Sequence, residues 1–420
     1  MRWEKAKFIT LFLIQMSVIL SVTLACGWLA LKLGQARVVG EIVGGILLGP
    51  SLLGRIAPQT FAMLFPNGSL AAFEILSTIG LILFLFIIGT EVDLDQLYHH
   101  RATALLTSGM SILAPFAIAM TLAHSLRARF APPGVGSGTF LLFLGISMSI
   151  TAFPVLARIL EERKLLGSAL GTMAIFCAAV DDVVAWLLLA LALALLGANG
   201  GPASLPLRLA GLLVYLLVML AVVRPLASWF LRKQRASAMS LEVLGLTLAA
   251  VFASSAATEA IGVHPLFGAF LAGVCLPRNP QWQTAFRARL DTIVSVFLLP
   301  LFFALIGMRT RIDLLNSAAV WFWTGVVLFA AIVGKLGGAA LAARWTGQSW
   351  TDALSLGVLL NTRGLVELVV LNIAYEVGVF SPTLFTMLVM MALITTISTV
   401  PILNLLPIES GERKTLPIPA

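Results

Sequence analysis

Apolar segments long enough to cross a lipid bilayer recur along the whole chain. One runs from Gly171 to Ala190, and another covers about 316–345 and includes the stretch from Val326 to Ala340. A membrane-spanning helix needs about 20 mostly apolar residues, because the hydrocarbon core is about 30 Å thick. Only 11% of the residues are charged, against about 25% in a soluble domain. The sequence therefore predicts an all-α membrane protein, and we expect no soluble domain of useful size.

The apolar segments predict thirteen helices, of which the second and ninth are short and rich in glycine. They are expected at 8–31, 37–53, 70–90, 102–125, 138–160, 167–197, 206–231, 240–261, 263–276, 292–308, 316–345, 353–376 and 381–405. An odd number of spans puts the termini on opposite sides of the membrane. Because more Lys and Arg lie in loops on the C-terminal side, we expect the N-terminus outside and the C-terminus in the cytoplasm. Residues 1–406 would form the membrane domain and 407–420 a short cytoplasmic tail.

Two pairs of segments resemble each other across the chain. Leu81–Gly89 resembles Leu299–Gly307, and the glycine-rich Gly40–Pro50 resembles Gly262–Gly273. An odd number of helices separates the partners, so they run in opposite directions, as in the inverted repeats of secondary transporters. The repeats would be about 37–197 and 263–405, with a linker helix at 206–231. Convergent use of glycine and phenylalanine in lipid-facing helices remains the alternative.

The fifth and twelfth predicted helices carry interruptions at equivalent places in the two repeats. Pro154 removes a backbone donor, and Gly364 weakens the helical turn. Thr151, Asn361 and Thr362 can supply replacement hydrogen-bond partners. Interrupted helices in both repeats predict a binding site at the membrane midplane, where the broken ends would offer helix dipoles and free carbonyl groups to an ion.

Three charged residues interrupt apolar segments near this expected site, namely Asp181, Asp182 and Lys335. Each costs about 2.5–3.5 kcal/mol at the centre of a bilayer. Consecutive helical side chains point about 100° apart, so one aspartate can line a water-filled cavity while the other leans toward Lys335. Such a coupled group can exchange protons, and its carboxylates with the Thr151 hydroxyl offer hard oxygens to Na⁺ or K⁺. The alternative is a buried ion pair that only fixes helix packing.

Other polar residues near the interruptions are weaker candidates. Arg363 and Glu367 lie four residues apart, so they can neutralise each other on one helix face, and both a structural and a transport role remain open. Ser149 lies beside the fifth-helix interruption and is a possible supporting residue. Glu41, in the short second helix, is expected at the membrane interface.

The sequence lacks the motifs of nucleotide-binding and hydrolytic enzymes, including the Walker A and H-E-x-x-H patterns. The three cysteines lie in separate apolar segments without metal-ligand spacing, as expected of small buried side chains. We therefore expect no enzyme activity, no cofactor and no metal other than a transported cation. The excess of Lys and Arg is expected in cytoplasmic loops, and no nucleic-acid partner is predicted.

The segments described above resemble the second family of monovalent cation:proton antiporters. This family includes the plant cation/H⁺ exchangers and the bacterial glutathione-gated potassium efflux systems. The matching strings are Val39–Ser51, Ser149–Leu160, Val180–Val183 and Asn361–Leu368. The similarity extends from the first predicted helix to the thirteenth.

The resemblance implies a homodimer with a rigid dimerisation panel and a mobile core that holds two crossed, broken helices. We expect the protein in a bacterial inner or cell membrane. It also implies that Asp182 is the essential ion- and proton-binding carboxylate, with Asp181 beside it and Lys335 as the basic residue of the core. Family members with an Asp-Asp pair resemble electrogenic exchangers. The expected function is antiport of Na⁺ or K⁺ against H⁺ by alternating access. A cation channel of the same fold and a transport-inactive membrane sensor remain as alternatives.

Overall fold

The computed structural model describes residues 2–66, 68–91, 101–195, 204–232, 240–263, 265–277, 279–310, 312 and 317–407, and the predicted tail beyond 407 lies outside these residues. Within the described residues the regular structure is helical, with no strand. The helices of the first half are α1 (Arg2–Lys32), α2 (Arg37–Leu48), α3 (Leu53–Ile56), α4 (Pro58–Leu64), α5 (Ala71–Glu91), α7 (Arg101–Phe130), α8 (Ser137–Ser149), α9 (Phe153–Glu162) and α10 (Ala169–Leu195).

The second half continues with α11 (Ser204–Val218), α12 (Arg224–Arg232), α13 (Leu241–Ile261), α14 (Pro265–Val274), α15 (Pro280–Ile293), α16 (Leu299–Met308), α17 (Ala318–Ile332), α18 (Gly338–Trp345), α19 (Trp350–Leu360), α20 (Leu365–Glu376) and α21 (Pro382–Leu405). Short π-helical segments at Met219–Val223, Val294–Leu298 and Val333–Gly337 join α11 to α12, α15 to α16 and α17 to α18.

Among the described residues, eleven helices are long and apolar enough to span a membrane. The two shorter apolar helices, α14 and α19, occupy the remaining predicted positions. The tenth helix begins at Pro280 rather than near 292. Its polar first turns are helical because the Asn279 side chain accepts a hydrogen bond from the Gln281 amide and Pro280 occupies the first turn. The chain is thus a multi-pass membrane protein, as predicted.

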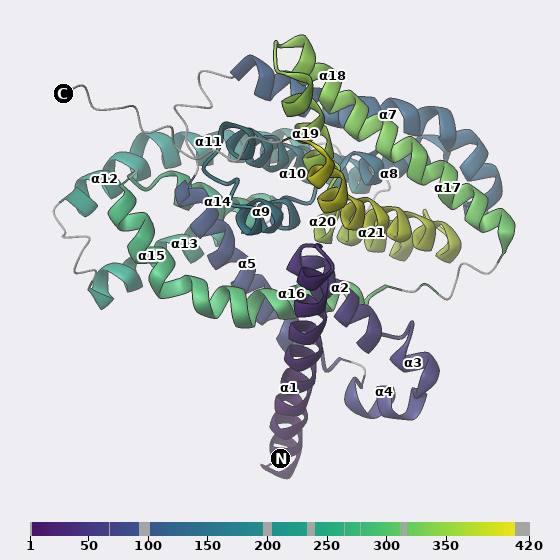
Figure 1. The fold of residues 1–420 in the computed structure, drawn as a ribbon, viewed down its shortest axis with the longest axis horizontal. Coiled ribbons are helices and arrows are strands. Elements are labelled where there is room, and N and C mark those ends of the chain that lie inside the picture. Colours follow the sequence, from purple (N-terminus) through teal and green to yellow (C-terminus); the bar gives the residue numbers. More distant parts are fainter. Residues whose placement is uncertain are drawn as a thin grey trace.

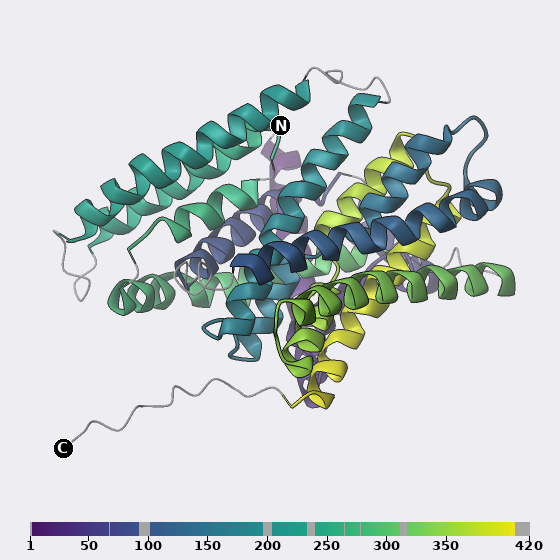
Figure 2. The same ribbon diagram turned by 90° about the horizontal axis from the view of Figure 1, so that it is seen from above.

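The helices divide into two groups with α9, α10 and α14 between them (Figure 1). Helices α11, α12, α13 and α15 lie on one side, and α7, α8 and α17 to α21 lie on the other. The view turned by 90° shows the same separation (Figure 2). Helix α1, drawn in purple, extends away from both groups in Figure 1.

The fifth and twelfth helices are both broken, and their breaks touch each other. The fifth helix stops at Ser149, the end of α8, and resumes at Phe153 as α9. The twelfth helix stops at Leu360, the end of α19, and resumes at Leu365 as α20. The Ala152 amide donates a hydrogen bond to the Thr362 carbonyl oxygen over 2.9 Å. The predicted pair of crossed, broken helices is therefore confirmed, and each break supplies a hydrogen-bond partner to the other.

The segments that resemble each other in sequence make two similar close crossings. A Cβ atom added at Gly89 in α5 would lie 2.2 Å from a carbonyl oxygen of α14, and one added at Gly273 in α14 would lie 2.3 Å from a carbonyl oxygen of α5. In the same way, Cβ atoms at Gly45 in α2 and Gly307 in α16 would each lie 2.1 Å from a carbonyl oxygen of the other helix. Only glycine permits these approaches. The repeat boundaries at 37–197 and 263–405 stay predictions.

An ionic network ties the end of α9 to α2 and α15. Arg158 donates to Glu162 over 3.1 Å and to Glu161 over 3.0 Å. Glu161 also accepts from Arg287 of α15 over 2.8 Å, and Glu162 accepts from the Arg37 amide at the start of α2, also over 2.8 Å. The network therefore links the C-terminal end of α9 to the start of α2 and to α15.

Glu41 lies close to this network, but its side chain is fully buried. The Nε atom of Arg37 lies 3.9 Å from a Glu41 carboxylate oxygen. Helices α1 and α16 pack against α2, so protein encloses the Glu41 side chain, and its place at the membrane interface stays a prediction.

Candidate ion-binding site

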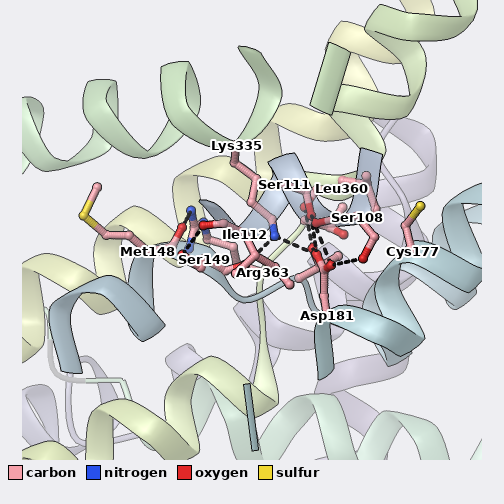
Figure 3. Close-up of polar contacts among 12 residues, drawn as sticks. Ser108, Ser111, Ile112, Met148, Ser149, Cys177, Asp181, Lys335, Leu360 and Arg363 are labelled. Carbon is pink, nitrogen blue, oxygen red and sulfur yellow. Dashed lines mark hydrogen bonds and ion pairs between the residues drawn. The ribbon is translucent and has the colours of Figure 1, made fainter. Parts of the chain in front are cut away.

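Asp181 of α10 lies at the centre of a buried cluster of hydrogen-bond donors (Figure 3). The Ser108 hydroxyl donates to Oδ1 over 3.1 Å, and the Ser111 hydroxyl donates to Oδ1 over 3.1 Å and to Oδ2 over 2.8 Å. Oδ2 also accepts from the Thr151 hydroxyl over 2.6 Å and from Lys335 Nζ over 2.8 Å. The carboxylate is thus held by four side chains from three other segments.

Close packing between helices brings Lys335 to this cluster. Lys335 belongs to the π-helical segment Val333–Gly337, and such segments are frequent at functional sites. A Cβ at Gly334 would lie 2.7 Å from Pro115 Cα, and one at Gly338 would lie 2.6 Å from Ala114 Cβ, both in α7. The glycines therefore let α17 and α18 approach α7, which carries the two serines.

Two positively charged side chains donate hydrogen bonds to the carbonyl groups at the C-terminal end of α8. Arg363 donates to the carbonyl oxygens of Ser147 and Met148 over 2.9 and 2.8 Å, and Lys335 donates to that of Ser149. Cations are favourable there because a helix C-terminus carries partial negative charge. The prediction that the break leaves these carbonyls free for an ion is therefore wrong for α8. The Ser149 hydroxyl bonds to the Ile112 carbonyl instead of the aspartates.

Arg363 and Glu367 form the predicted ion pair, with Nη1 and Oε1 3.4 Å apart and both side chains fully buried. The two residues do not share a helix face, because Arg363 lies in the break and α20 begins only at Leu365. The second Glu367 oxygen has no hydrogen-bond partner within the described residues.

The remaining predicted residues shape the breaks. Thr362 donates to the Leu359 carbonyl over 2.8 Å, which satisfies the end of α19. Pro154 lies in the first turn of α9, where its missing amide costs little, and Gly364 precedes α20. Asn361 is buried, and its Oδ1 atom has no partner among the described residues.

The two aspartates differ in their surroundings. Asp182 is also buried, with 8% of its surface exposed, but its Oδ1 atom has no hydrogen-bond partner among the described residues. The structure therefore brings Asp181, Thr151 and Lys335 together, and leaves Asp182 with an oxygen free to bind a ligand.

Ser108 and Ser111 were not predicted from the sequence. Their spacing carries a usable signal, because residues three apart lie on one helix face and the surrounding segment of α7 is apolar. Two hydroxyls on one face of a membrane-spanning helix indicate a buried polar partner.

Comparisons with known proteins agree with this fold. Residues 19–405 match the model of the sodium/hydrogen exchanger transmembrane family. The chain is 40% identical over 397 residues to the Na⁺/H⁺ antiporter NhaS4 of Synechocystis. The aligned region covers 94% of this chain and 97% of that protein. It is 39% identical to cation/H⁺ antiporter 17 of Arabidopsis thaliana and 32% identical to K⁺/H⁺ antiporter 1 of Saccharomyces cerevisiae, and it spans 48% of the length of each.

Solved structures show the same fold at low sequence identity. The sodium proton antiporter MjNhaP1 of Methanocaldococcus jannaschii at pH 8 aligns with a TM-score of 0.58 and 15% identity, over 94% of this chain and 96% of that one. An electron-microscopy map of the same antiporter gives a TM-score of 0.61 over 91% of this chain. On the family match and the identities above, the chain belongs to the sodium/hydrogen exchanger transmembrane family.

Proposed function

We propose that this protein exchanges Na⁺ or K⁺ for H⁺ by alternating access and is a transporter rather than an enzyme. The observation that carries the proposal is the unequal pair of buried aspartates. Asp181 is held by Lys335 and three hydroxyl groups, whereas Asp182 keeps an unpartnered oxygen. A buried carboxylate oxygen without a partner is costly, and a proton or a cation would relieve this cost.

The two aspartates then take different roles. Asp182 binds the proton or the cation directly, and Asp181 holds Lys335 and fixes the broken helices around the site. Asn361, with its buried and unpartnered Oδ1, offers a further oxygen from the second break. Competition of protons and cations for one carboxylate couples their movements without a cofactor.

The family and the charge distribution support the cellular setting of this proposal. We infer a homodimer in a bacterial inner membrane, with the N-terminus outside and the C-terminus in the cytoplasm. An exchange of two protons for one cation, in which the coupled Asp181–Lys335 pair takes up the second proton, moves net charge. A potential of 100 mV would then bias each net charge by about 2.3 kcal/mol.

The decisive test uses purified protein in liposomes that contain a pH-sensitive dye. The unmodified protein should dequench the dye when Na⁺ or K⁺ is added, and Asp182→Asn should abolish this signal. Asp352→Asn is the matched control, because Asp352 is exposed in the first turn of α19 and far along the chain from the aspartate pair. Full activity in Asp182→Asn would refute the assigned role, and unitary currents in a planar bilayer would refute exchange in favour of a channel.

The charge movement needs its own measurement. With Na⁺ as substrate and the membrane potential clamped by K⁺ and valinomycin, the rate should depend on the imposed potential. A rate independent of potential, with no charge movement on a capacitive sensor, would contradict electrogenic exchange.

A further inference from the structure

A cavity of about 210 Å³ lies between α5 and α16 on one side and α20 and α21 on the other. Its walls combine polar with apolar side chains: Glu74, Ser77, Thr78, Arg309, Asn372 and the apolar Phe302. On this measure of volume about 10–15 Å³ is enough for one water molecule, so the cavity has room for a cation with part of its hydration shell.

The mouth of the cavity lies where two of its helices end. Glu74 is in the first turn of α5, and Arg309 directly follows α16. Their side chains are 49% and 52% exposed and form an ion pair with 2.5 Å between Oε1 and Nη2. Both charges therefore face solvent at the entrance, where Arg309 neutralises the only carboxylate among the lining residues.

A buried hydroxyl group points to a ligand within the cavity. Ser77 is only 3% exposed and lines the cavity, and its Oγ atom has no hydrogen-bond partner among the described residues. Buried hydroxyl groups are normally paired with protein or ordered water. The Ser77 hydroxyl is thus available to a bound water molecule or directly to a cation.

A second cavity lies between the larger cavity and the second broken helix. A smaller cavity of about 20 Å³, large enough for one water molecule, is lined by Arg363, Gly364 and Thr396. Ile306 and Leu368 line both cavities. They form an apolar partition between the larger cavity and the break that contacts Thr151.

We propose that the larger cavity is an entry site for the hydrated monovalent cation, in which Glu74 attracts the cation and Arg309 weakens that attraction by pairing with Glu74. The Arg158 network lies at the start of α2, whereas Glu74 and Arg309 lie where α5 begins and where α16 ends. This inference rests on the proposed cation/H⁺ exchange.

The test compares Glu74→Gln, Arg309→Gln and the double variant in liposomes of zwitterionic lipid, so that an anionic headgroup cannot bind Arg309. Glu74→Gln leaves an unpaired cation and should raise the KM for Na⁺ by up to about fivefold. Arg309→Gln frees the carboxylate and should lower the KM by a similar factor, and the double variant should return close to the original KM. The maximal rate should stay the same, and added choline chloride should reduce both shifts because it screens exposed charges.

Two further variants separate a local site from general surface charge. Glu259→Gln removes an exposed carboxylate from the last turn of α13, outside the cavity lining, and should leave the KM unchanged. Ser77→Ala should raise the KM, and Ser77→Thr should restore it. An unchanged KM in Glu74→Gln and Arg309→Gln, shifts in the same direction, or an equal shift in Glu259→Gln would overturn the inference. Absence of exchange in the unmodified protein would instead refute the proposed function.

Discussion

Removing both partners of the buried Lys335–Asp181 pair should destabilise the protein far less than the sum of the two single removals. Both side chains are fully buried, so either one left alone must remain charged without water or neutralise. Breaking such a pair costs about 3–5 kcal/mol, whereas replacing both partners with neutral groups is often tolerated.

The surroundings predict which single variant suffers more. In Lys335→Met, Asp181 keeps three hydroxyl donors, so we expect a loss near about 3 kcal/mol. In Asp181→Asn, Lys335 keeps mainly the Ser149 carbonyl, so we expect a loss near about 5 kcal/mol. The double variant should lose less than the sum of both by about 3 kcal/mol or more.

The assay is equilibrium unfolding of detergent-solubilised protein by sodium dodecyl sulfate, followed by tryptophan fluorescence. The four proteins form a double-mutant cycle, and the coupling free energy is the measured quantity. Additive losses, or a larger loss for Lys335→Met than for Asp181→Asn, would refute this account of the site's electrostatics.

Three further changes test other parts of the structure. Ser111→Ala removes a donor to both oxygens of the first aspartate and should slow exchange about tenfold or more, since a hydrogen bond to a charged group contributes about 1.5–3 kcal/mol; Ser111→Thr should recover most of the rate, and equal rates in both variants would contradict the assignment. Gly307→Ala should lower the free energy of unfolding by at least about 1–3 kcal/mol through overpacking. Gly109→Ala should not lower it, because a Cβ added at Gly109 would have no neighbouring atom within 4 Å. Thermal unfolding of both variants measures the difference. Arg158→Gln should destabilise by about 3 kcal/mol or more because its partners are largely buried, whereas the more exposed Arg287→Gln should cost about 1 kcal/mol or less; similar losses for both would refute the network's proposed importance.

The sequence predicts the helices well because membrane depth dictates both their length and their composition. Pro154 and Gly364 predict the two breaks, since each disturbs helical hydrogen bonding by a known mechanism. The polar start of α15 was missed because the amphipathic turns Pro280–Ile293 lie outside the apolar segment that defines a span. Their cap, Asn279, was the available signal.

The assignment of the aspartates shows what sequence alone lacks. Two consecutive aspartates must face different directions, and nothing in the sequence says which one faces Lys335. That choice depends on the position of α7, whose Ser108 and Ser111 lie on the face toward α10. The occupied carbonyls of α8 were also beyond prediction, because Arg363 reaches them only through the crossing of the two breaks.

The glycine crossings have a consequence for how the protein is made. Gly45 and Gly307 interlock two helices whose residues lie roughly 260 positions apart, which is a delay of about 13–50 s at about 5–20 residues per second of synthesis. During that interval α2 lies in the membrane before α16 is made, and α5 likewise lies there before α14 is made, over a shorter interval. The newly inserted first half is therefore an incomplete scaffold. Until the second half is inserted, lipid or insertion factors would have to cover the glycine faces of α2 and α5.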